Sequence, residues 1–191
     1  MRLADGDALA RTGVAMPIQV DAYTAGGMVR GLTSRSGHLR EIMETAGELA
    51  LERASWQGLG DATARPAGEV TFPIDDVLVA IGDDDPNGPV HASWHEIHLE
   101  LGPYAIDGEL PTLPGYDPGR ALTRPTGEFV QLRDVRLSLL SEPSRGATPG
   151  HYALVNRYGV DLVRADIMLG FYFPGATLDG VPETSAAAPT A

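Results

Sequence analysis

Apolar and polar residues alternate along two separate segments of the chain, and glycines interrupt each segment. Residues 20–33 (VDAYTAGGMVRGLT) and residues 97–110 (IHLELGPYAIDGEL) both read as a strand, a turn and a second strand. Their apolar and glycine positions coincide at a constant offset of 77, which pairs Val20 with Ile97, Val29 with Ile106 and Gly31 with Gly108. The pattern predicts two β-hairpins at equivalent places in the chain.

A further match follows each hairpin. The segment from Gly47 to Arg53 aligns with the segment from Gly127 to Arg133 at an offset of 80, so the second copy needs three extra residues, which we place in 111–118. In each copy we expect a short helix, a strand and a closing pair of strands. These lie at residues 38–45, 49–56 and 70–81 in the first copy, and at 118–123, 129–139 and 152–163 in the second, where the closing pair reads as a hairpin.

Four landmarks in the same order favour an internal duplication over chance similarity between short β-rich segments. Acidic residues with Pro, Asn and Gly at 83–89 are typical of a surface linker, so we expect the boundary near residue 87. The predicted organisation has four parts. They are a flexible N-terminus at residues 1–15, a first repeat at 16–87, a second repeat with an aromatic C-terminal segment at 88–176, and a flexible tail at 177–191.

The second copy resembles the Sm-like small β-barrel, a bent five-stranded sheet with two signature segments. The resemblance rests on Leu101, Gly102, Gly108, Leu110, Leu132, Asp134 and Val135 for the first segment, and on Val155, Arg157, Gly159, Val160 and Val163 for the second. The first copy keeps Gly31 and the apolar run at 77–79. The resemblance implies a mainly β fold of two tandem Sm-like small barrels, each a β-β-α-β-β-β unit with one short helix.

Sm-like proteins often build rings by pairing edge strands and often bind RNA, so the resemblance implies both as possibilities here. The family holds a base with an Asn before the third strand, where this chain has Thr126, Gly127 and Glu128. Arg157 and Gly159 are the positions that the resemblance assigns to nucleic acid. The RNA alternative also expects one face to collect Arg120, Arg124, Arg133, Arg136 and Arg157.

Composition narrows the chemistry open to this chain of 191 residues. Cys is absent and all fourteen basic residues are Arg, which excludes disulfides, thiolate metal sites, Schiff bases and lysine-dependent phosphate loops. The net charge of -12 disfavours contact with a polyphosphate backbone. No apolar run approaches the roughly 20 residues that cross a bilayer. Because the acidic start of the chain also lacks a secretory pattern, we expect a cytoplasmic protein. We also expect it to use no cofactor.

Three of the five histidines, His91, His95 and His98, cluster with Glu96 and Glu100. Imidazole and carboxylate groups bind zinc and other divalent ions, so a metal-dependent enzyme is one alternative. If the apolar residues of this segment face the core of a strand, His98 and the glutamates share the outer face while His95 points inward. The competing interpretation is an exposed polar strand face.

Two other patterns are weaker candidates for chemistry. The aspartates at 75–76 and 83–85 lack the alternating ligands and closing Glu of a calcium loop, and they read as turn and solvated linker. Ser34, Ser36 and His38 lack a glycine-framed elbow and an identifiable acid partner. Whether the protein is an enzyme therefore stays open, with a non-catalytic role favoured.

Three consecutive aromatic residues, Phe171, Tyr172 and Phe173, cannot all point into one small core. They either pack back across the barrel or dock onto a neighbouring subunit. The leading hypothesis is a non-catalytic protein interaction or assembly module that oligomerises through barrel edge strands, with itself or another protein as partner and with these residues as candidate contacts. The alternatives are an RNA-binding Sm-like protein and a metal-dependent enzyme.

Overall fold

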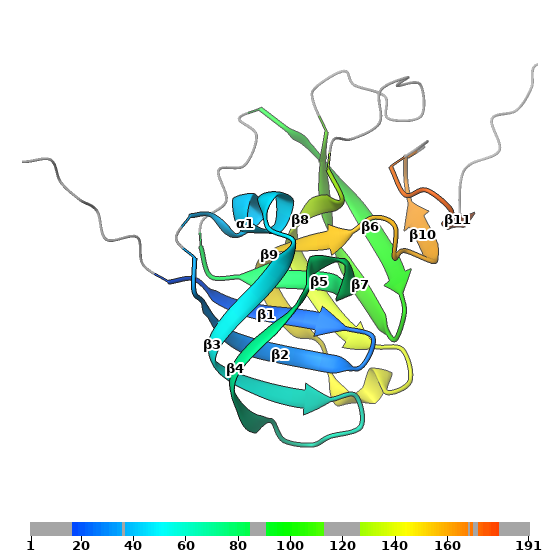
Figure 1. Cartoon of the computed structure of the whole chain (residues 1–191). Coiled ribbons are helices and arrows are strands. Elements are labelled where there is room, and N and C mark those ends of the chain that lie inside the picture. Colours follow the sequence, from blue (N-terminus) through cyan, green and yellow to red (C-terminus); the bar gives the residue numbers. More distant parts are fainter. Residues whose placement is uncertain are drawn as a thin grey trace, which may run out of the picture.

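Strands form most of the structure (Figure 1). A computed structural model describes residues 17–35, 37–84, 91–112, 127–167, 169 and 172–179. The strands of the first half are β1 (Gln19–Thr24), β2 (Gly27–Thr33), β3 (Glu48–Gly58), β4 (Arg65–Pro73) and β5 (Val77–Gly82). Those of the second half are β6 (Ser93–Leu101), β7 (Tyr104–Thr112), β8 (Phe129–Leu139), β9 (Thr148–Asn156), β10 (Leu162–Ala165) and β11 (Thr177–Asp179). The prediction of a mainly β chain is confirmed.

Helical structure is sparse in the described part of the chain. It consists of α1 (Leu39–Thr45) and two single 3-10 turns, η1 (Ile74–Asp76) and η2 (Pro143–Arg145). The helix predicted at residues 38–45 is confirmed, and its buried side chains, Leu39, Ile42 and Met43, have the spacing of one helix face. The helix predicted at 118–123 and the boundary near residue 87 lie outside the described residues. No described helix has the length and hydropathy needed to cross a membrane.

All eleven strands belong to one open sheet with the order β11-β10-β6-β7-β8-β9-β5-β1-β2-β3-β4. Within it, the strand order of the first half, β5-β1-β2-β3-β4, recurs in the second half as β10-β6-β7-β8-β9. The two predicted hairpins are confirmed as the antiparallel pairs β1–β2 and β6–β7. Figure 1 shows each half curling, so that the two halves lie side by side.

The hairpin predicted at residues 152–163 is wrong. β9 pairs with β8 and β5, whereas β10 pairs with β6 and β11. The reason lies in the connection between β9 and β10. Its Arg157 backbone N–H donates to the Glu128 carbonyl, and its Asp161 N–H donates to the carbonyl of Glu100 in β6, the partner strand of β10. The connection therefore carries the chain across to β6 instead of folding it back on β9.

Gly31 and Gly108 occupy equivalent places, where the second strand of each half passes close to the third. A Cβ atom on Gly31 would lie 3.0 Å from the Glu52 carbonyl oxygen, and one on Gly108 would lie 3.1 Å from that of Arg133. The next residues, Arg53 and Asp134, both have left-handed backbones, with φ of 51° and 49°. The third strands of the two halves, β3 and β8, are therefore related by an offset of 81 residues, not the predicted 80. The close approach of each glycine to the third strand sets the register, whereas the identity of Gly47 and Gly127 does not.

The hydrophobic interior consists of two clusters, and each contains side chains from both halves. The cluster built mainly from the second half includes Tyr23, Val79 and Ile81 of the first. The cluster built mainly from the first half includes Phe129, Tyr152 and Leu154 of the second. Since each core needs the other half to complete it, the two halves pack as one body.

Candidate functional site

The two halves meet at a short antiparallel contact between β5 and β9. Val79 pairs with Val155 and Ala80 with Leu154, and all four residues are fully buried. At this contact β5, the fifth strand of the first half, covers the outer edge of β9, the fourth strand of the second half. A sheet edge covered in this way has its backbone groups paired and its apolar side chains removed from water.

Two tyrosines pack across this junction. The rings of Tyr23 and Tyr104 meet edge to face with centroids 5.4 Å apart, and the Tyr104 hydroxyl donates to the Thr24 carbonyl at 3.0 Å. Burial raises the pKa of Tyr23 to about 12, with Asp21 adding to the effect, and burial also raises the pKa of Tyr104. The folded junction therefore favours the protonated, uncharged form of both tyrosine hydroxyls.

Asp84 ties the helix of the first half to the second half. Its carboxylate accepts the Leu39 backbone N–H at 3.0 Å and the Tyr152 hydroxyl, and it lies 3.5 Å from His38 Nδ1. Burial, followed by the bond to Asp84, raises the pKa of Tyr152. Because only 12% of the Asp84 side chain is exposed, the interpretation of residues 83–85 as solvated linker is wrong at this position. Here the carboxylate caps a helix that its own His38 does not cap.

Asp84 is also the acid that sequence analysis could not identify for His38. The structure does not complete a catalytic group around this pair. Ser34 lies beside β3, where its backbone N–H donates to the Ala50 carbonyl at 3.4 Å, and Ser36 lies outside the described residues. We therefore assign the pair to the junction between the halves.

A cleft of about 320 Å³ opens between the halves, beside Tyr23 and Tyr104. Arg145 of η2 reaches across it from the second half and donates to the backbone carbonyls of Leu59 and Asp61 in the first. The arginine therefore works as a polar tie across the cleft.

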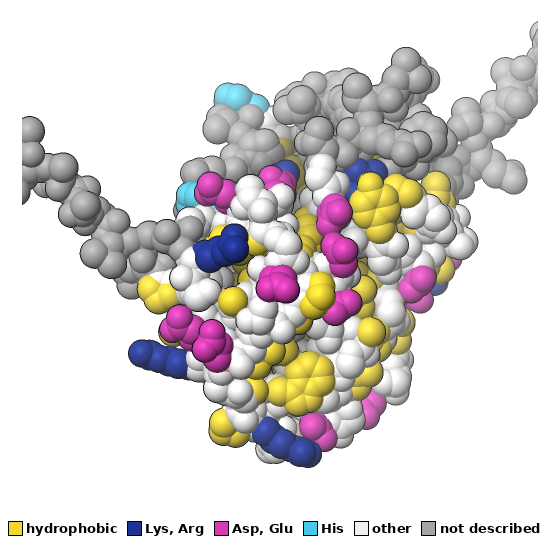
Figure 2. Space-filling model, in the orientation of Figure 1, with side chains coloured by type: hydrophobic (Ala, Val, Ile, Leu, Met, Phe, Trp, Pro, Cys, Tyr) yellow, Lys and Arg dark blue, Asp and Glu magenta, His cyan; other side chains and the backbone are white. Residues whose placement is uncertain are grey.

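The outer edge of β4 lies open at one end of the sheet. β4 pairs with β3 and is the last strand in the order, so no described strand pairs with its other side. Most of its residues are exposed, and the two that are half-buried, Val70 and Phe72, pack against the first-half core. Figure 2 shows hydrophobic side chains reaching the surface in the lower part of the view, where β2, β3 and β4 lie.

At the opposite end of the sheet, the chain covers the outer edge of β10 with a short strand, β11, which is the terminal strand there. β11 pairs with β10 in parallel, with Leu162 opposite Thr177, and all three residues of β11 are exposed. The Thr177 backbone N–H donates to the Asp161 carbonyl at 2.8 Å, and Arg164 Nε lies 2.9 Å from an Asp179 carboxylate oxygen. The predicted tail thus begins with a short strand, which pairs with β10 although the segment has no apolar alternation of its own.

The three candidate metal ligands, His91, His95 and His98, do not form a common site. His91 lies exposed at a turn with φ of 70°. His95 Nε2 lies 3.0 Å from Thr112 Oγ1, while His98 Nδ1 lies 2.7 Å from an Asp107 carboxylate oxygen. The buried residues of β6 alternate as predicted, which places His95 and His98 on opposite faces of the strand. Within the described ranges no three His, Asp or Glu side chains could hold one ion.

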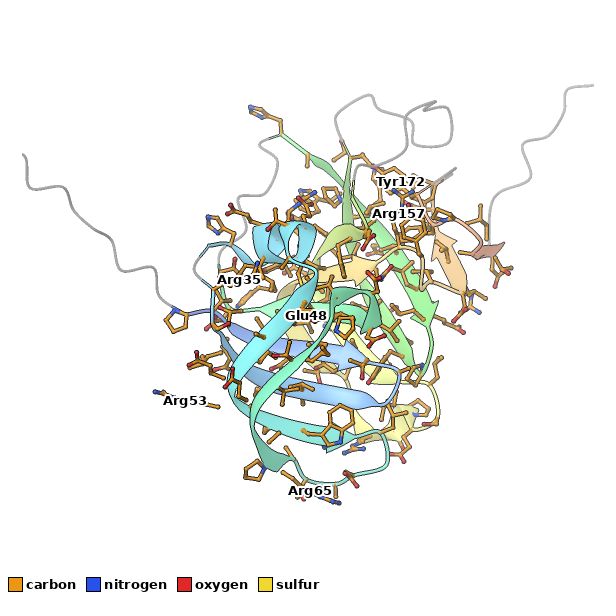
Figure 3. The ribbon with its side chains drawn as sticks, viewed as in Figure 1. Arg35, Glu48, Arg53, Arg65, Arg157 and Tyr172 are labelled. Atoms are coloured by element: carbon orange, nitrogen blue, oxygen red, sulfur yellow. The ribbon has the colours of Figure 1, made fainter. Side chains whose placement is uncertain are left out.

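Of the candidate nucleic-acid residues, Arg157 is buried and Gly159 is half-buried. Arg157 is 1% exposed, and its guanidinium lies 5.4 Å from the Tyr158 ring centroid. A Cβ on Gly159 would lie 3.0 Å from Leu78, so the glycine permits close packing between the halves. Figure 3 shows Arg157 in the upper part of the view, far from the outward-pointing Arg53 and Arg65 in the lower part.

The other arginines of the RNA alternative do not join Arg157. Arg133 is paired with Glu109, with Nη2 2.5 Å from the carboxylate, and its guanidinium lies 3.6 Å from the Trp94 ring centroid. Arg136 is exposed in an outer groove that it shares with Asp107 and other acids. Arg120 and Arg124 lie outside the described residues. The described arginines therefore do not converge on one face.

The aromatic segment packs back onto the second half. Phe173 is 4% exposed within the second-half core, and Tyr172 is half-buried against the same core, with the two ring centroids 6.3 Å apart. Phe171 lies outside the described residues. Because the segment leads directly into β11, we infer that its packing on the second-half core helps to hold this strand against β10.

Comparison of the chain with protein-family models, with curated proteins and with solved structures found no match.

Proposed function

We propose that the chain is a tandem pair of Sm-like small barrels that acts as a non-catalytic assembly module, joining a second copy of itself through β4. The repeated strand order and the equivalent glycine contacts at Gly31 and Gly108 support the barrel proposal. The observation that carries the assembly proposal is the open edge of β4, a strand of nine residues, whereas the strand at the other end of the described sheet, β11, has three.

An antiparallel contact between two β4 strands is the arrangement that this edge favours. It uses the same edge on both copies, so it closes as a two-fold dimer. Pro66 and Pro73 cannot donate backbone hydrogen bonds, which confines pairing to the residues between them. A register centred on Val70 keeps the two copies of Glu69 from lying directly opposite each other. It also places Phe72 opposite Gly68, where no side chain obstructs the ring.

The strand order of the second half supports a β-strand as the partner of β4. In the second half, the strand at the same position, β9, has its outer edge covered by an antiparallel strand, β5. The arginines and histidines of the described chain give no comparable support to the RNA or metal alternatives, for the reasons of placement given above.

Light scattering coupled to size-exclusion chromatography tests the proposal over a range of protein concentrations. The wild-type protein should show a dimer mass. In this register Thr71 lies opposite Glu69 of the other copy, so Thr71→Glu places like charges opposite each other on both sides of the two-fold axis and should weaken the dimer at least tenfold. Thr45→Glu, the same change on the exposed end of α1, should leave the dimer intact. A wild-type protein that stays monomeric at high concentration would contradict the proposal.

A further inference from the structure

We infer that β11 is an intramolecular cap over a second assembly edge, the outer edge of β10, and that this edge accepts β4 of another copy once β11 leaves. The inference extends the proposed function, since it uses the same β4 edge. The contact between β5 and β9, which joins the two halves of the described chain, supports it.

The register of the sheet shows which residues of β5 and β10 are equivalent. Val20 and Ile97 hold the same place in the two halves, because each pairs with the glycine of its hairpin. Val20 also pairs with Gly82, and Ile97 also pairs with Ala165. Counting back along each strand, Val79 and Ala80 of β5 correspond to Leu162 and Val163 of β10.

These corresponding residues are the ones that carry the outer contacts. Val79 and Ala80 are the residues of β5 that pair with β9. Leu162 and Val163 both pair with β11. The last described strand, β11, therefore occupies the same stretch of edge at which, in the first half, a strand of the other half binds.

The incoming strand can be assigned by the same reasoning. Leu51 and Leu132 are the equivalent residues beneath Gly31 and Gly108. Leu51 pairs with Val70, and Leu132 pairs with Ala153. The two β9 residues that bind β5 therefore correspond to Thr71 and Phe72 of β4. A second copy would bring Phe72 opposite Leu162, and Thr71 opposite Val163.

The cap has few contacts to hold it. β11 is three residues long, all of them exposed, and Leu178 at its centre is 40% exposed. Its ion pair with Arg164 has both side chains about half exposed, and such pairs contribute little to stability. β11 can therefore leave β10 without exposing the buried core, and a longer antiparallel strand can take its place.

The two edges would then build assemblies of different kinds. With β11 in place, the edge at that end is only three residues long, β4 offers the longer open edge, and assembly stops at a closed pair. With β11 displaced, β4 of one copy and β10 of the next form a head-to-tail contact, which continues until it closes as a ring or grows as a filament. The cap therefore limits the size of the assembly.

Two cap variants test this inference by light scattering. Asp179→Arg replaces the ion pair with repulsion of Arg164, and Leu178→Pro interrupts the strand at an exposed residue. Glu41→Arg on the exposed face of α1 is the control for the change in charge. We expect both cap variants to form species larger than a dimer, with a mass that rises with concentration, while the control keeps the wild-type mass. Adding Thr71→Glu to either cap variant places a charge opposite the buried Val163 and should abolish the larger species.

Hydrogen exchange of the β10 amides shows that the cap has been released, and far-UV circular dichroism shows that the fold is retained. If β10 exchanges faster in both cap variants and their mass still equals that of the wild type at every concentration, the inference is overturned. Larger species that persist with Thr71→Glu overturn it as well. A monomeric wild type whose cap variants assemble in a Thr71-dependent way would contradict the proposed dimer but support the cap.

Discussion

β4 and β9 occupy the same position in the strand order of the two halves, but their surroundings differ. Leu154 and Val155 of β9 are fully buried, whereas Thr71 is exposed and Phe72 is half-buried at the matching places of β4. The difference arises because β5 covers the outer edge of β9, while no described strand covers that of β4. A single chain thus shows the same strand position in a covered and an open state, and the open one is where we propose that a second copy binds.

The sequences of the two strands fit these surroundings. β9 has a run of consecutive buried residues from Tyr152 to Asn156, as expected of a strand covered on both faces. β4 combines Pro66, Pro73 and Glu69 with two half-buried apolar residues. Proline and charge on an edge strand restrict which strands can pair with it, so the open edge is selective.

The largest effect should come from removing the buried side chain of β9. Leu154→Ala deletes contacts in the first-half core and should lower the free energy of unfolding by about 2–5 kcal/mol. The matched change on the open strand, Thr71→Ala, should alter the free energy by no more than about 0.5 kcal/mol at concentrations where the protein is monomeric. Urea denaturation measures both. Equal losses for the two variants would mean that β4 is covered as well as β9.

Alkaline pH should weaken the junction that covers β9. The pKa of Tyr23 is about 12 in the folded protein and 10.0 when unperturbed. Its contribution to stability is complete below pH 10 and is lost as pH rises toward 12, because the unfolded chain loses the proton first. The loss for this group is roughly 3 kcal/mol at most, and Tyr104 and Tyr152 act in the same direction.

Tyr23→Phe should flatten this dependence when unfolding is measured in urea between pH 9 and 12. Tyr158→Phe is the control, because Tyr158 is 61% exposed and lies outside the junction. If Tyr23→Phe keeps the full wild-type slope, the hydroxyl does not contribute to the junction as we describe it.

A smaller effect should test how far the two halves are equivalent. Gly31→Ala and Gly108→Ala each place a Cβ within about 3 Å of the third strand, so each should destabilise the protein by about 1–3 kcal/mol. Gly47→Ala, where no atom lies within 4 Å, should change stability by no more than about 0.5 kcal/mol. Similar losses at the two glycines support equivalent packing in the two halves, whereas a loss at only one would limit the equivalence to strand order.

Local patterns predicted the elements of the sheet well. Alternation and turn glycines identified both hairpins, and apolar runs identified β3 and β8, because these signals depend on residues that are neighbours in the chain. The predicted hairpin at 152–163 was wrong because strand patterns do not name the partner of a strand. The histidines that cluster in the sequence do not form a common site, since His95 and His98 project from opposite faces of β6.

The candidate site could be predicted only in outline. Edge strands were expected to carry assembly, but which edges are open depends on two long-range contacts. The first is the pairing of β5 with β9, and the second is the pairing of β11 with β10. Asp84 illustrates the same limit, because an acidic run typical of a linker also supplies the buried carboxylate that binds Leu39 and Tyr152.

The sequence by itself determined that the chain is mainly β, where its two hairpins lie, and which chemistries its missing Cys and Lys exclude, since these follow from composition and short-range periodicity. Only the tertiary structure decided that the halves share their cores, that β9 is covered, that β4 is open and that β11 covers β10. The physical reason is that every backbone edge offers the same unpaired groups. The residue that satisfies them is set by what packing brings alongside.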